Sequence, residues 1–293
     1  MKEITLHDPD ALVTGEWLER HLNNPDLRIF DCSTILSFET GDDRPYIAIN
    51  CKDEHDEGHI PGADYFYLQA DFSRQGSRLA MTLADPETVA AAFASSGIDD
   101  HTRVVLYSRR SVSWATRFWW MLRWLGFDNA AVLDGGYEVW LADGRPTTTE
   151  PSAYPPGSLT IKLRPELFVG KEQVLDAISN PSTCTINALG TDVHSGENPR
   201  YGRPGRVPGS VNVPQISLVD PTTQKFAAPE VISRRFVSVD ADGATKHITY
   251  CGGGIFATVD AFWLYQLGHD GVSVYDNSMS EWGPDETLPI ERD

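Results

Sequence analysis

The feature of the sequence with the clearest chemical potential is one cysteine at the end of an apolar run. Cys251 follows a run that ends at Tyr250, and it precedes Gly252, Gly253 and Gly254, after which an amphipathic segment begins. In a parallel sheet, reactive groups collect where a strand ends and the next helix begins. We therefore expect Cys251 to lie at a junction of this kind.

The three glycines after Cys251 suit a loop that binds a negative charge. Glycine tolerates the backbone conformations in which successive N–H groups point into one concavity, and it has no side chain to block access. Such a cup, with the positive end of the following helix dipole, would stabilise a thiolate and make it nucleophilic. The alternative is a buried structural cysteine, because free cysteines are among the most buried residues. The specific pattern of strand, cysteine, three glycines and helix favours catalysis.

The chain contains an internal repeat whose landmarks recur in the same order. Segments 104–108 and 247–251 are similar, and each precedes a long apolar segment that ends in glycine. Three further pairs recur at similar offsets: 30–32 with 186–188, 58–63 with 205–210, and 132–136 with 274–278. Four ordered pairs indicate one duplicated domain with small differences in loop length.

The two copies are expected to meet near residue 155. The stretch 145–157 is rich in proline and polar residues and has neither helical nor alternating periodicity. We therefore predict one domain over residues 1–155 and a second over residues 156–293. Residues 159–163 alternate like a strand, and we expect them to pack back on the first domain.

Each copy alternates short β-branched runs with amphipathic segments. Such alternation predicts a mainly parallel sheet flanked by helices, so the fold class is α/β with two similar domains in tandem. The expected strands are 27–30, 103–107, 131–133, 183–186, 247–250 and 272–275, and the expected helices are 14–22, 86–95, 111–125, 171–178 and 257–267.

Composition excludes several classes of partner. The 293 residues include 24 Lys and Arg against 42 Asp and Glu, a formal net charge of −18, with 41% hydrophobic residues. This surplus of negative charge argues against nucleic acid and anionic membrane surfaces as partners. No stretch approaches the ~20 apolar residues of a membrane span, and the first residues lack the apolar core of a secretory signal. We therefore expect a cytoplasmic protein.

Cysteine usage gives no sign of a disulfide framework or of a bound metal. Cys32, Cys51, Cys184 and Cys251 are few and scattered, and no pair has the C-x-x-C spacing of zinc sites or redox motifs. The acidic stretch 53–57 has irregular spacing and is better explained as a solvated loop. We expect no metal and no cofactor, and we interpret the other three cysteines as small hydrophobic residues on or beside strands.

Three motifs together resemble the tandem-domain rhodanese-type sulfurtransferases, the thiosulfate and 3-mercaptopyruvate class. They are the repeated GHIPGA-like element (58–63 and 205–210), the Tyr-Cys-Gly-x-Gly loop (250–254) and the Tyr-Asp-x-Ser-x-Ser-Glu-Trp ending (275–282). The resemblance covers essentially the whole chain. It implies that only the C-terminal domain is catalytic, because Ser108 stands at the position of the cysteine in the first copy.

The resemblance also implies a mechanism. The Cys251 thiolate takes a sulfur atom from a small anionic donor, and a thiol, cyanide or a thioredoxin-like protein then accepts it. Related dual-specificity phosphatases have a loop one residue longer that ends in arginine, which is absent here, so phosphatase activity is not expected. The persulfide would be held by the N–H groups of Gly252, Gly253, Gly254, Ile255, Phe256 and Ala257.

The sequence departs from the family pattern where the substrate anion is usually bound. Leu189 stands where family members commonly have arginine, and Phe256 replaces the usual threonine or arginine of the loop. Arg200 and Arg203 are candidates for a replacement anion site, because arginine suits bidentate binding of carboxylate or sulfonate groups. The alternative is that they are solvated loop residues. These losses also keep open a non-catalytic sulfur-relay or regulatory module.

His59 of the first GHIPGA-like element admits two interpretations. It is a structural residue of a turn, or an acid–base group, since an imidazole titrates near neutral pH. Arg206 occupies the equivalent place in the second copy. A structural role is favoured for His59.

Overall fold

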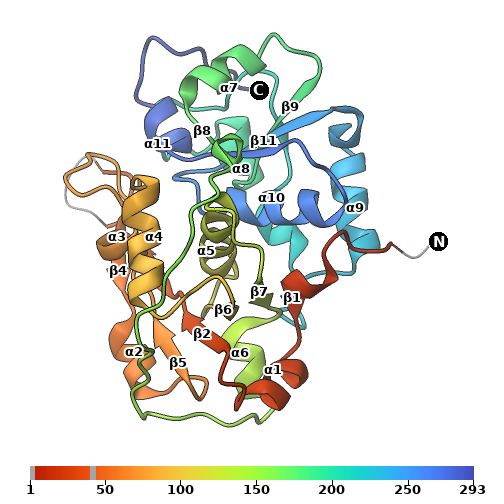
Figure 1. Cartoon of the computed structure of the whole chain (residues 1–293). Coiled ribbons are helices and arrows are strands. Elements are labelled where there is room, and N and C mark those ends of the chain that lie inside the picture. Colours follow the sequence, from red (N-terminus) through yellow and green to blue (C-terminus); the bar gives the residue numbers. More distant parts are fainter. Residues whose placement is uncertain (1–3, 40–43) are drawn as a thin grey trace. The chain divides into compact units, whose positions relative to one another are not determined.

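The computed structural model describes residues 4–39 and 44–293, which form two compact units (Figure 1). The N-terminal unit consists of Asp10–Arg164 with Pro221–Lys225, and the C-terminal unit contains the residues up to Pro9, Pro165–Asp220 and Phe226–Asp293. The first unit therefore extends beyond the boundary expected near residue 155.

Residues 159–163 pack on the N-terminal unit, as expected, but they do not form the expected strand. The N–H of Lys162 donates to the carbonyl of Leu125 and that of Arg164 to the carbonyl of Trp124, both at 2.8 Å. These carbonyls end a helix rather than a strand, so the segment satisfies helix-terminal acceptors and joins no sheet.

The N-terminal unit is built on a five-stranded parallel sheet with the order β1-β7-β6-β2-β5. A separate antiparallel ribbon pairs β3 with β4. The strands are β1 Leu12–Val13, β2 Leu27–Asp31, β3 Thr34–Ser37, β4 Ile47–Asn50, β5 Ala63–Tyr65, β6 Arg103–Tyr107 and β7 Ala130–Leu133; the helices are α1 Gly15–His21, α2 Lys52–Glu57, α3 Leu68–Asp71, α4 Pro86–Ser95, α5 Ser113–Trp124 and α6 Gly136–Ala142.

The C-terminal unit repeats this topology with the order β10-β9-β11-β12-β8. The strands are β8 Phe168–Val169, β9 Thr183–Asn187, β10 Val211–Asn212, β11 Lys246–Tyr250 and β12 Val272–Tyr275; the helices are α7 Lys171–Ala177, α8 Thr191–Ser195, α9 Pro229–Val237, α10 Ala257–Gln266 and α11 Ser278–Trp282. The α/β class and the duplication are confirmed.

The duplication extends to individual hydrogen bonds. His59 forms an antiparallel bridge with Thr148, and Arg206, its counterpart, forms one with Glu291. The indole N–H of Trp140 donates to the carbonyl of Pro146, and that of Trp282 donates to the carbonyl of Pro289, each at 2.8 Å. In both units the GHIPGA-like element thus holds the segment that follows the last helix.

Burial explains why the expected strands formed. After its first residue, β6 is buried throughout, and so is β11. Both are central strands of parallel sheets, which are covered on both faces and therefore have continuous apolar runs. Helix starts follow local capping: Thr14 accepts a hydrogen bond from the N–H of Trp17, and Asp85 accepts one from Thr88.

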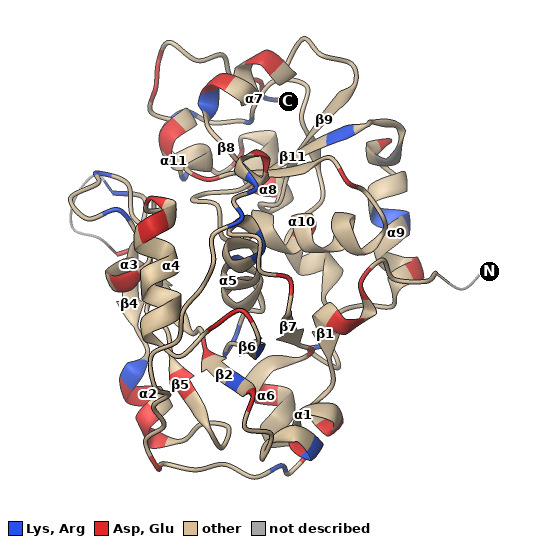
Figure 2. Ribbon diagram, in the orientation of Figure 1, with Lys and Arg blue, Asp and Glu red and all other residues tan. Residues whose placement is uncertain are grey.

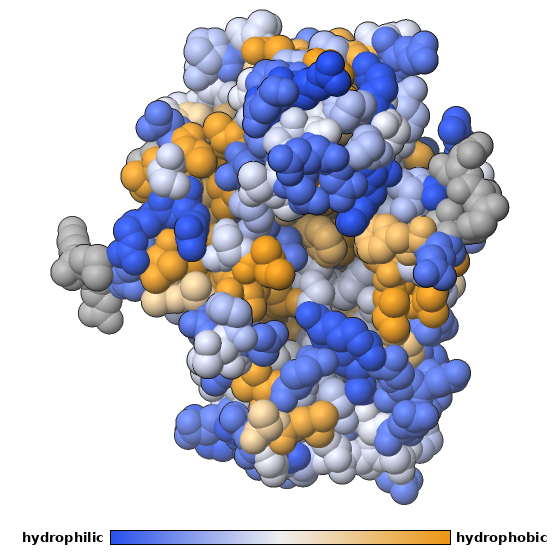
Figure 3. All heavy atoms as spheres, turned by 180° about the vertical axis from the view of Figure 1, so that it is seen from behind, coloured by the Kyte–Doolittle hydropathy of each residue, from blue (hydrophilic) through white to orange (hydrophobic). Residues whose placement is uncertain are grey.

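The surface is polar and acidic. Figure 2 shows Asp and Glu along both units, with Lys and Arg interspersed among them. On the face shown in Figure 3, apolar residues are divided into patches by hydrophilic ones. Within residues 4–39 and 44–293, no helix is long and apolar enough to cross a membrane.

Candidate active site

Cys251 lies directly after β11, at the carboxyl end of the central strand of its sheet, as expected. It is buried, and its N–H donates to Oγ of Ser278 at 3.0 Å. The Ser278 hydroxyl in turn donates to the carbonyl of Tyr275, at the end of β12. The cysteine is therefore held by the end of the neighbouring strand.

The start of α11 fixes the next part of the loop. The N–H of Met279 donates to the carbonyl of Cys251 at 3.0 Å, and the N–H of Ser280 donates to the carbonyl of Gly252 at 2.8 Å. The Ser280 hydroxyl donates to the same carbonyl of Gly252. Two carbonyls of the cysteine loop are thus turned toward α11.

Several N–H groups of the loop are left over. Among the described residues, the N–H groups of Gly252, Gly253, Ile255 and Phe256 find no hydrogen-bond acceptor. Helix α10 begins immediately afterwards, so its positive end also lies at this loop. Unused N–H groups beside a sulfur atom are suited to hold a thiolate or the outer sulfur of a persulfide.

Tyr201 is a residue of this site that the sequence did not indicate. A Cβ atom placed on Gly252 would lie only 2.1 Å from the Tyr201 hydroxyl oxygen, so the phenol occupies the space that a side chain would need. Glycine is therefore required at this loop position for packing as well as for access. Nothing in the Arg-Tyr-Gly sequence around Tyr201 signals this contact.

Ser278 and Ser280 were recognised as part of a motif, but no role followed from the sequence. The spacing of the motif was the signal that could have found them, because both serines bind the cysteine loop. Ser278 has φ 50°, a left-handed conformation that is costly for serine. Gly136, its counterpart in the N-terminal unit, has φ 57°. The hydroxyl contact to Cys251 is what serine adds at this position.

The two candidate arginines have different environments. The Arg203 guanidinium donates to the carbonyls of Trp282, Gly283, Asp285 and Leu288. This arrangement caps the chain after α11 and engages all three guanidinium nitrogens. Arg203 therefore acts as a structural anchor of the loop, and its geometry disfavours the expected anion-binding role.

Arg200 is exposed and precedes Tyr201, which lies against the cysteine loop. Arg206 is buried, and its guanidinium pairs with Glu291 and Asp293. Its charge is therefore compensated within the unit. Of the basic residues 200, 203 and 206, Arg200 is the one whose position and exposure suit a substrate anion.

Leu189 supplies no charge to the site. Its side chain is buried, and its N–H donates to Oδ1 of Asn187 at 3.0 Å. The equivalent contact in the N-terminal unit runs from the N–H of Ser33 to Oδ1 of Asp31. The strand end therefore keeps its backbone geometry although the arginine expected for the family is absent.

The loop of the N-terminal unit that starts at Ser108 differs from the cysteine loop. Its N–H groups are used internally: Arg109 donates to Oγ of Ser33, Arg110 to Oε1 of Glu138 and Ser111 to the carbonyl of Arg109. The Ser108 hydroxyl donates to the carbonyl of Ser111. This loop has no comparable set of unused donors.

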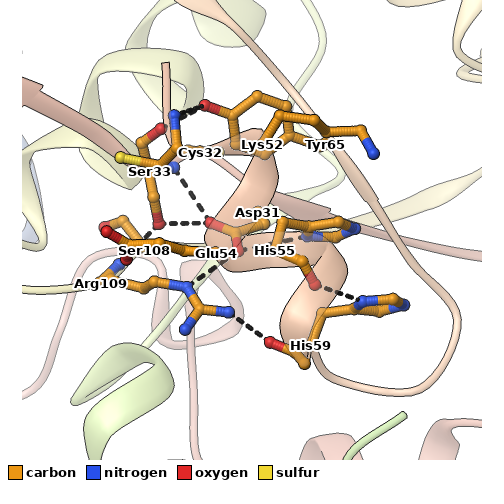
Figure 4. Close-up of polar contacts among 12 residues, drawn as sticks. Asp31, Cys32, Ser33, Lys52, Glu54, His55, His59, Tyr65, Ser108 and Arg109 are labelled. Atoms are coloured by element: carbon orange, nitrogen blue, oxygen red, sulfur yellow. Dashed lines mark hydrogen bonds and ion pairs between the residues drawn. The ribbon is translucent and has the colours of Figure 1, made fainter. Parts of the chain in front are cut away.

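A buried ionic cluster lies beside the Ser108 loop (Figure 4). Asp31 contacts Arg109 and His55, and the Arg109 guanidinium lies 3.8 Å from the centre of the Tyr137 ring. Burial raises the pKa of Asp31. Hydrogen bonds to His55 and Ser33 and the charge of Arg109 together lower it by more than burial raises it, so the pKa of Asp31 lies below its usual value. The positive charge of Arg109 is therefore neutralised by an internal carboxylate.

His59 has a structural environment. Its Nδ1 lies 2.8 Å from the carbonyl oxygen of His55 and its Nε2 lies 3.1 Å from that of Glu150, and its ring stacks on His55. The side chain is buried. Both ring nitrogens are occupied by the main chain, which favours the role in a turn.

The other three cysteines lack the features of Cys251. Burial raises the pKa of the Cys32 thiol well above its usual value, raises that of Cys51, and raises that of Cys184 to about 11. These groups are thiols rather than thiolates at neutral pH. None of them is suited to act as a nucleophile.

Comparisons with known proteins identify the family of this chain. The model of the rhodanese-like domain matches residues 14–143 and 188–285. The chain is 32% identical over 286 residues to 3-mercaptopyruvate sulfurtransferase of Escherichia coli (strain K12), covering 95% of this chain and 97% of the relative. It is 27% identical over 298 residues to the sulfur carrier protein TtuD of Thermus thermophilus, covering 97% of each. The crystal structure of SseA, a 3-mercaptopyruvate sulfotransferase from E. coli, is similar with a TM-score of 0.80 and 27% identity, covering 92% of this chain and 98% of that one.

The chain belongs to the rhodanese-like family, with one rhodanese-like domain in each unit. It is a sulfurtransferase, similar over nearly its whole length to enzymes of the 3-mercaptopyruvate class.

Proposed function

We propose that Cys251 carries the transferred sulfur as a persulfide and that the donor is 3-mercaptopyruvate or thiosulfate. The observation that supports this most is the set of unused N–H groups at Gly252, Gly253, Ile255 and Phe256 around a cysteine whose own N–H is fixed by Ser278. Main-chain dipoles held in this way stabilise negative charge on sulfur without reorganisation. Gly254 is the remaining residue of the loop, and Ala257 begins α10.

The first half of the reaction forms a sulfur–sulfur bond. With 3-mercaptopyruvate, the Cys251 thiolate attacks the donor sulfur, the carbon–sulfur bond breaks, and its electron pair stays on carbon as the enolate, which takes a proton to give pyruvate. With thiosulfate, the bond between the two sulfur atoms breaks and sulfite leaves with the electron pair. Either route leaves one added sulfur on Cys251.

The second half regenerates the cysteine. A thiol, cyanide or a reduced thioredoxin-like protein attacks the outer sulfur, and the Cys251 thiolate leaves. The loop that stabilised the persulfide also stabilises this leaving thiolate, so one set of donors serves both halves. A loop without basic side chains next to the cysteine favours 3-mercaptopyruvate as the donor.

Arg200 is proposed to hold the anionic group of the donor. Both donors are anions and the chain carries a formal charge of −18, so a local positive charge is needed to bind them. The exposure of Arg200 and the contact of its neighbour Tyr201 with the cysteine loop support this assignment.

A second candidate is a sulfur relay, in which Cys251 receives sulfur from another protein and passes it on without turnover of a small donor. The relative named as a sulfur carrier favours it, as do Leu189 and Phe256 at positions where the family usually binds the donor. A cytoplasmic location, which cell fractionation would test, stays a prediction with either candidate.

Rapid-quench measurement of product release separates the two candidates. The enzyme proposal predicts a burst of pyruvate or sulfite equal to the concentration of Cys251, followed by steady turnover once a thiol acceptor is added. A relay predicts no burst with either small donor, but transfer from a persulfide-carrying protein. Absence of both would contradict the proposed role of Cys251.

A further inference from the structure

A cavity of about 710 Å³ lies in the C-terminal unit, at the end of β11 opposite to Cys251. It is formed at the amino ends of the parallel strands, between α7 and the first residues of β9, β11 and β12. The cysteine loop follows the opposite, carboxyl end of β11. The proposed sulfur transfer makes no use of this cavity.

The N-terminal unit shows what occupies the same place in the other copy. The two copies align here by hydrogen bonds: the N–H of Leu27 donates to the carbonyl of Asn24 at 3.1 Å, and that of Thr183 to the carbonyl of Asn180 at 3.0 Å. Strand register agrees, since Leu27 is opposite Arg103 and Thr183 is opposite Lys246. Residues of α1 and α7 can therefore be compared one by one.

In the N-terminal unit the place is filled by an aromatic and cationic stack. The Trp17 ring lies 4.1 Å from the His21 ring at an interplanar angle of 20°, and the Arg103 guanidinium lies 5.8 Å from the Trp17 ring. Arg103 also donates to Oδ1 of Asn129. Trp17 packs on the hydrophobic core of this unit.

In the C-terminal unit all four residues are replaced by different ones. Gln173 stands in place of Trp17, Ala177 in place of His21, Lys246 in place of Arg103 and Gly271 in place of Asn129. All four replacements line the cavity. The cavity therefore lies where the first copy places its own indole and imidazole rings.

The rim of the cavity is acidic. Glu166, Asp176 and Asp270 line it together with Lys246, and all four are exposed. His247 also lines the cavity, but it is buried and its Nε2 lies 2.6 Å from the carbonyl oxygen of Ala241. Within the described part of the chain, none of the three carboxylates forms an ion pair. Asp128, the counterpart of Asp270, is paired with Arg123 and Arg164 in the first copy.

We propose that this cavity binds a small aromatic cation, that is, a planar ring of about indole size that carries an ammonium or guanidinium group. Half-buried Phe168 and buried Val272 offer apolar surface for the ring, and the rim carboxylates attract the charge. The volume is within the range of small-molecule sites, about 300–1,000 Å³. This ligand site is separate from sulfur transfer and does not depend on it.

Tryptamine is a suitable probe, with indole-3-acetate as the matched anion. Titration of the isotope-labelled full-length protein, followed by NMR, should shift the amide signals of Gly170, Gly271 and Val272 with tryptamine. Binding of indole-3-acetate should be at least 10-fold weaker. A small fragment that binds weakly has a Kd on the order of millimolar, so about 10 mM tryptamine should occupy the site. If tryptamine at that concentration shifts none of these signals, the proposal is wrong.

Two sets of variants make the test specific. The double substitution Gln173→Trp with Ala177→His fills the cavity as in the first copy and should weaken tryptamine binding at least 10-fold. Leu175→Trp adds the same ring to an exposed position of α7 that does not line the cavity, and binding should be unchanged. Equal binding in the filled variant would contradict the proposal.

A third variant tests the charge of the rim and leaves the interior of the cavity unchanged. Asp176→Asn with Asp270→Asn changes only exposed side chains and should remove most of the preference for tryptamine over indole-3-acetate. A preserved preference would mean that the rim does not select the charge. Sulfur transfer by Cys251 should be retained in all these variants, so failure of this proposal is distinguishable from failure of the proposed function.

Discussion

The N–H of Cys251 donates to the hydroxyl oxygen of Ser278 at 3.0 Å, which links the ends of two neighbouring strands. This bond and the contacts from Met279 and Ser280 fix the first two loop residues. The N–H groups of Gly252, Gly253, Ile255 and Phe256 have no acceptor among the described residues, so they can face a ligand. The preorganised cup is therefore a property of two segments that lie 27 residues apart in sequence.

Ser278→Gly tests this link without disturbing the backbone, because Gly136 has a similar φ at the equivalent position. Loss of the acceptor should lower kcat/KM about 10-fold, since a lost hydrogen bond of ~1.4 kcal/mol at a buried group corresponds to that factor. Steady-state kinetics with both donors measure it.

Ser238→Gly is the matched control, since among the described residues the Ser238 hydroxyl bonds only to the carbonyl of Arg235 at the end of α9. If Ser278→Gly has the same kcat/KM as the parent protein, the loop keeps its shape without this contact.

Ser108→Cys should not create a second active site. The N–H groups of Arg109, Arg110 and Ser111 already have acceptors, so they are not available to a thiolate at position 108. The double variant Ser108→Cys, Cys251→Ser should show no donor-dependent sulfur transfer above that of Cys251→Ser. Clear turnover in the double variant would contradict the importance of free N–H groups.

Arg200→Ala should raise the KM for the anionic donor about 10-fold, because a charge-assisted contact contributes about 1.5–3 kcal/mol. The effect should shrink with added salt, which screens the attraction in the parent protein. Arg200→Lys should recover part of the loss. An unchanged KM at low ionic strength would show that Arg200 does not bind the donor and that the main-chain N–H groups alone hold its anionic group.

Arg203→Ala should act on stability rather than on donor binding. Its guanidinium donates to four carbonyls around the end of α11, so its removal should lower the free energy of unfolding by about 2 kcal/mol. Denaturant unfolding measures this change. A raised KM with unchanged stability would instead show that Arg203 binds the donor anion.

His194 should make the protein less stable in mild acid. Burial, together with the positive charge of Arg206, lowers the pKa of His194 to about 4. Since an unfolded histidine titrates near pH 6.5, the unfolded chain binds more protons between pH 4 and 6.5. This contribution to stability is complete above pH 6.5 and is lost as the pH falls toward 4, with a slope of at most about 1.4 kcal/mol per pH unit.

His194→Gln removes the titrating group and should flatten the pH dependence of unfolding over this interval. Urea unfolding at pH 5 and pH 7 measures the difference for both proteins. An identical slope in the variant would exclude His194 as the source.

The sequence predicted the long, buried elements well, since β6 and β11 carry continuous apolar runs and α4 was expected at its observed bounds. It missed the short ribbon of β3 and β4, whose strands are partly exposed and lack a clear alternating pattern. It also placed a strand at 159–163, where Ile161 and Leu163 are exposed and the N–H of Lys162 bonds to the carbonyl of Leu125 instead of to a strand.

The site was predictable only in part. Cys251 and its glycines are local in sequence, so their pattern was sufficient to find them. The contacts of Tyr201 and Ser278 depend on tertiary structure, and no local pattern assigns them a role. Arg203 has the same residue type and loop as Arg200, and only its four carbonyl partners distinguish an anchor from a ligand-binding residue.

Peptide mass spectrometry after treatment with 3-mercaptopyruvate or thiosulfate tests directly whether Cys251 carries the sulfur. We expect one added sulfur atom on the peptide containing Cys251 and none on those containing Cys32, Cys51 or Cys184, because desolvation raises the pKa of each of these three thiols. Cys251→Ser should abolish sulfur transfer, while serine at the other three positions should leave it largely intact. A persulfide mainly on another cysteine, or transfer that survives Cys251→Ser, would show that Cys251 is not the sulfur carrier.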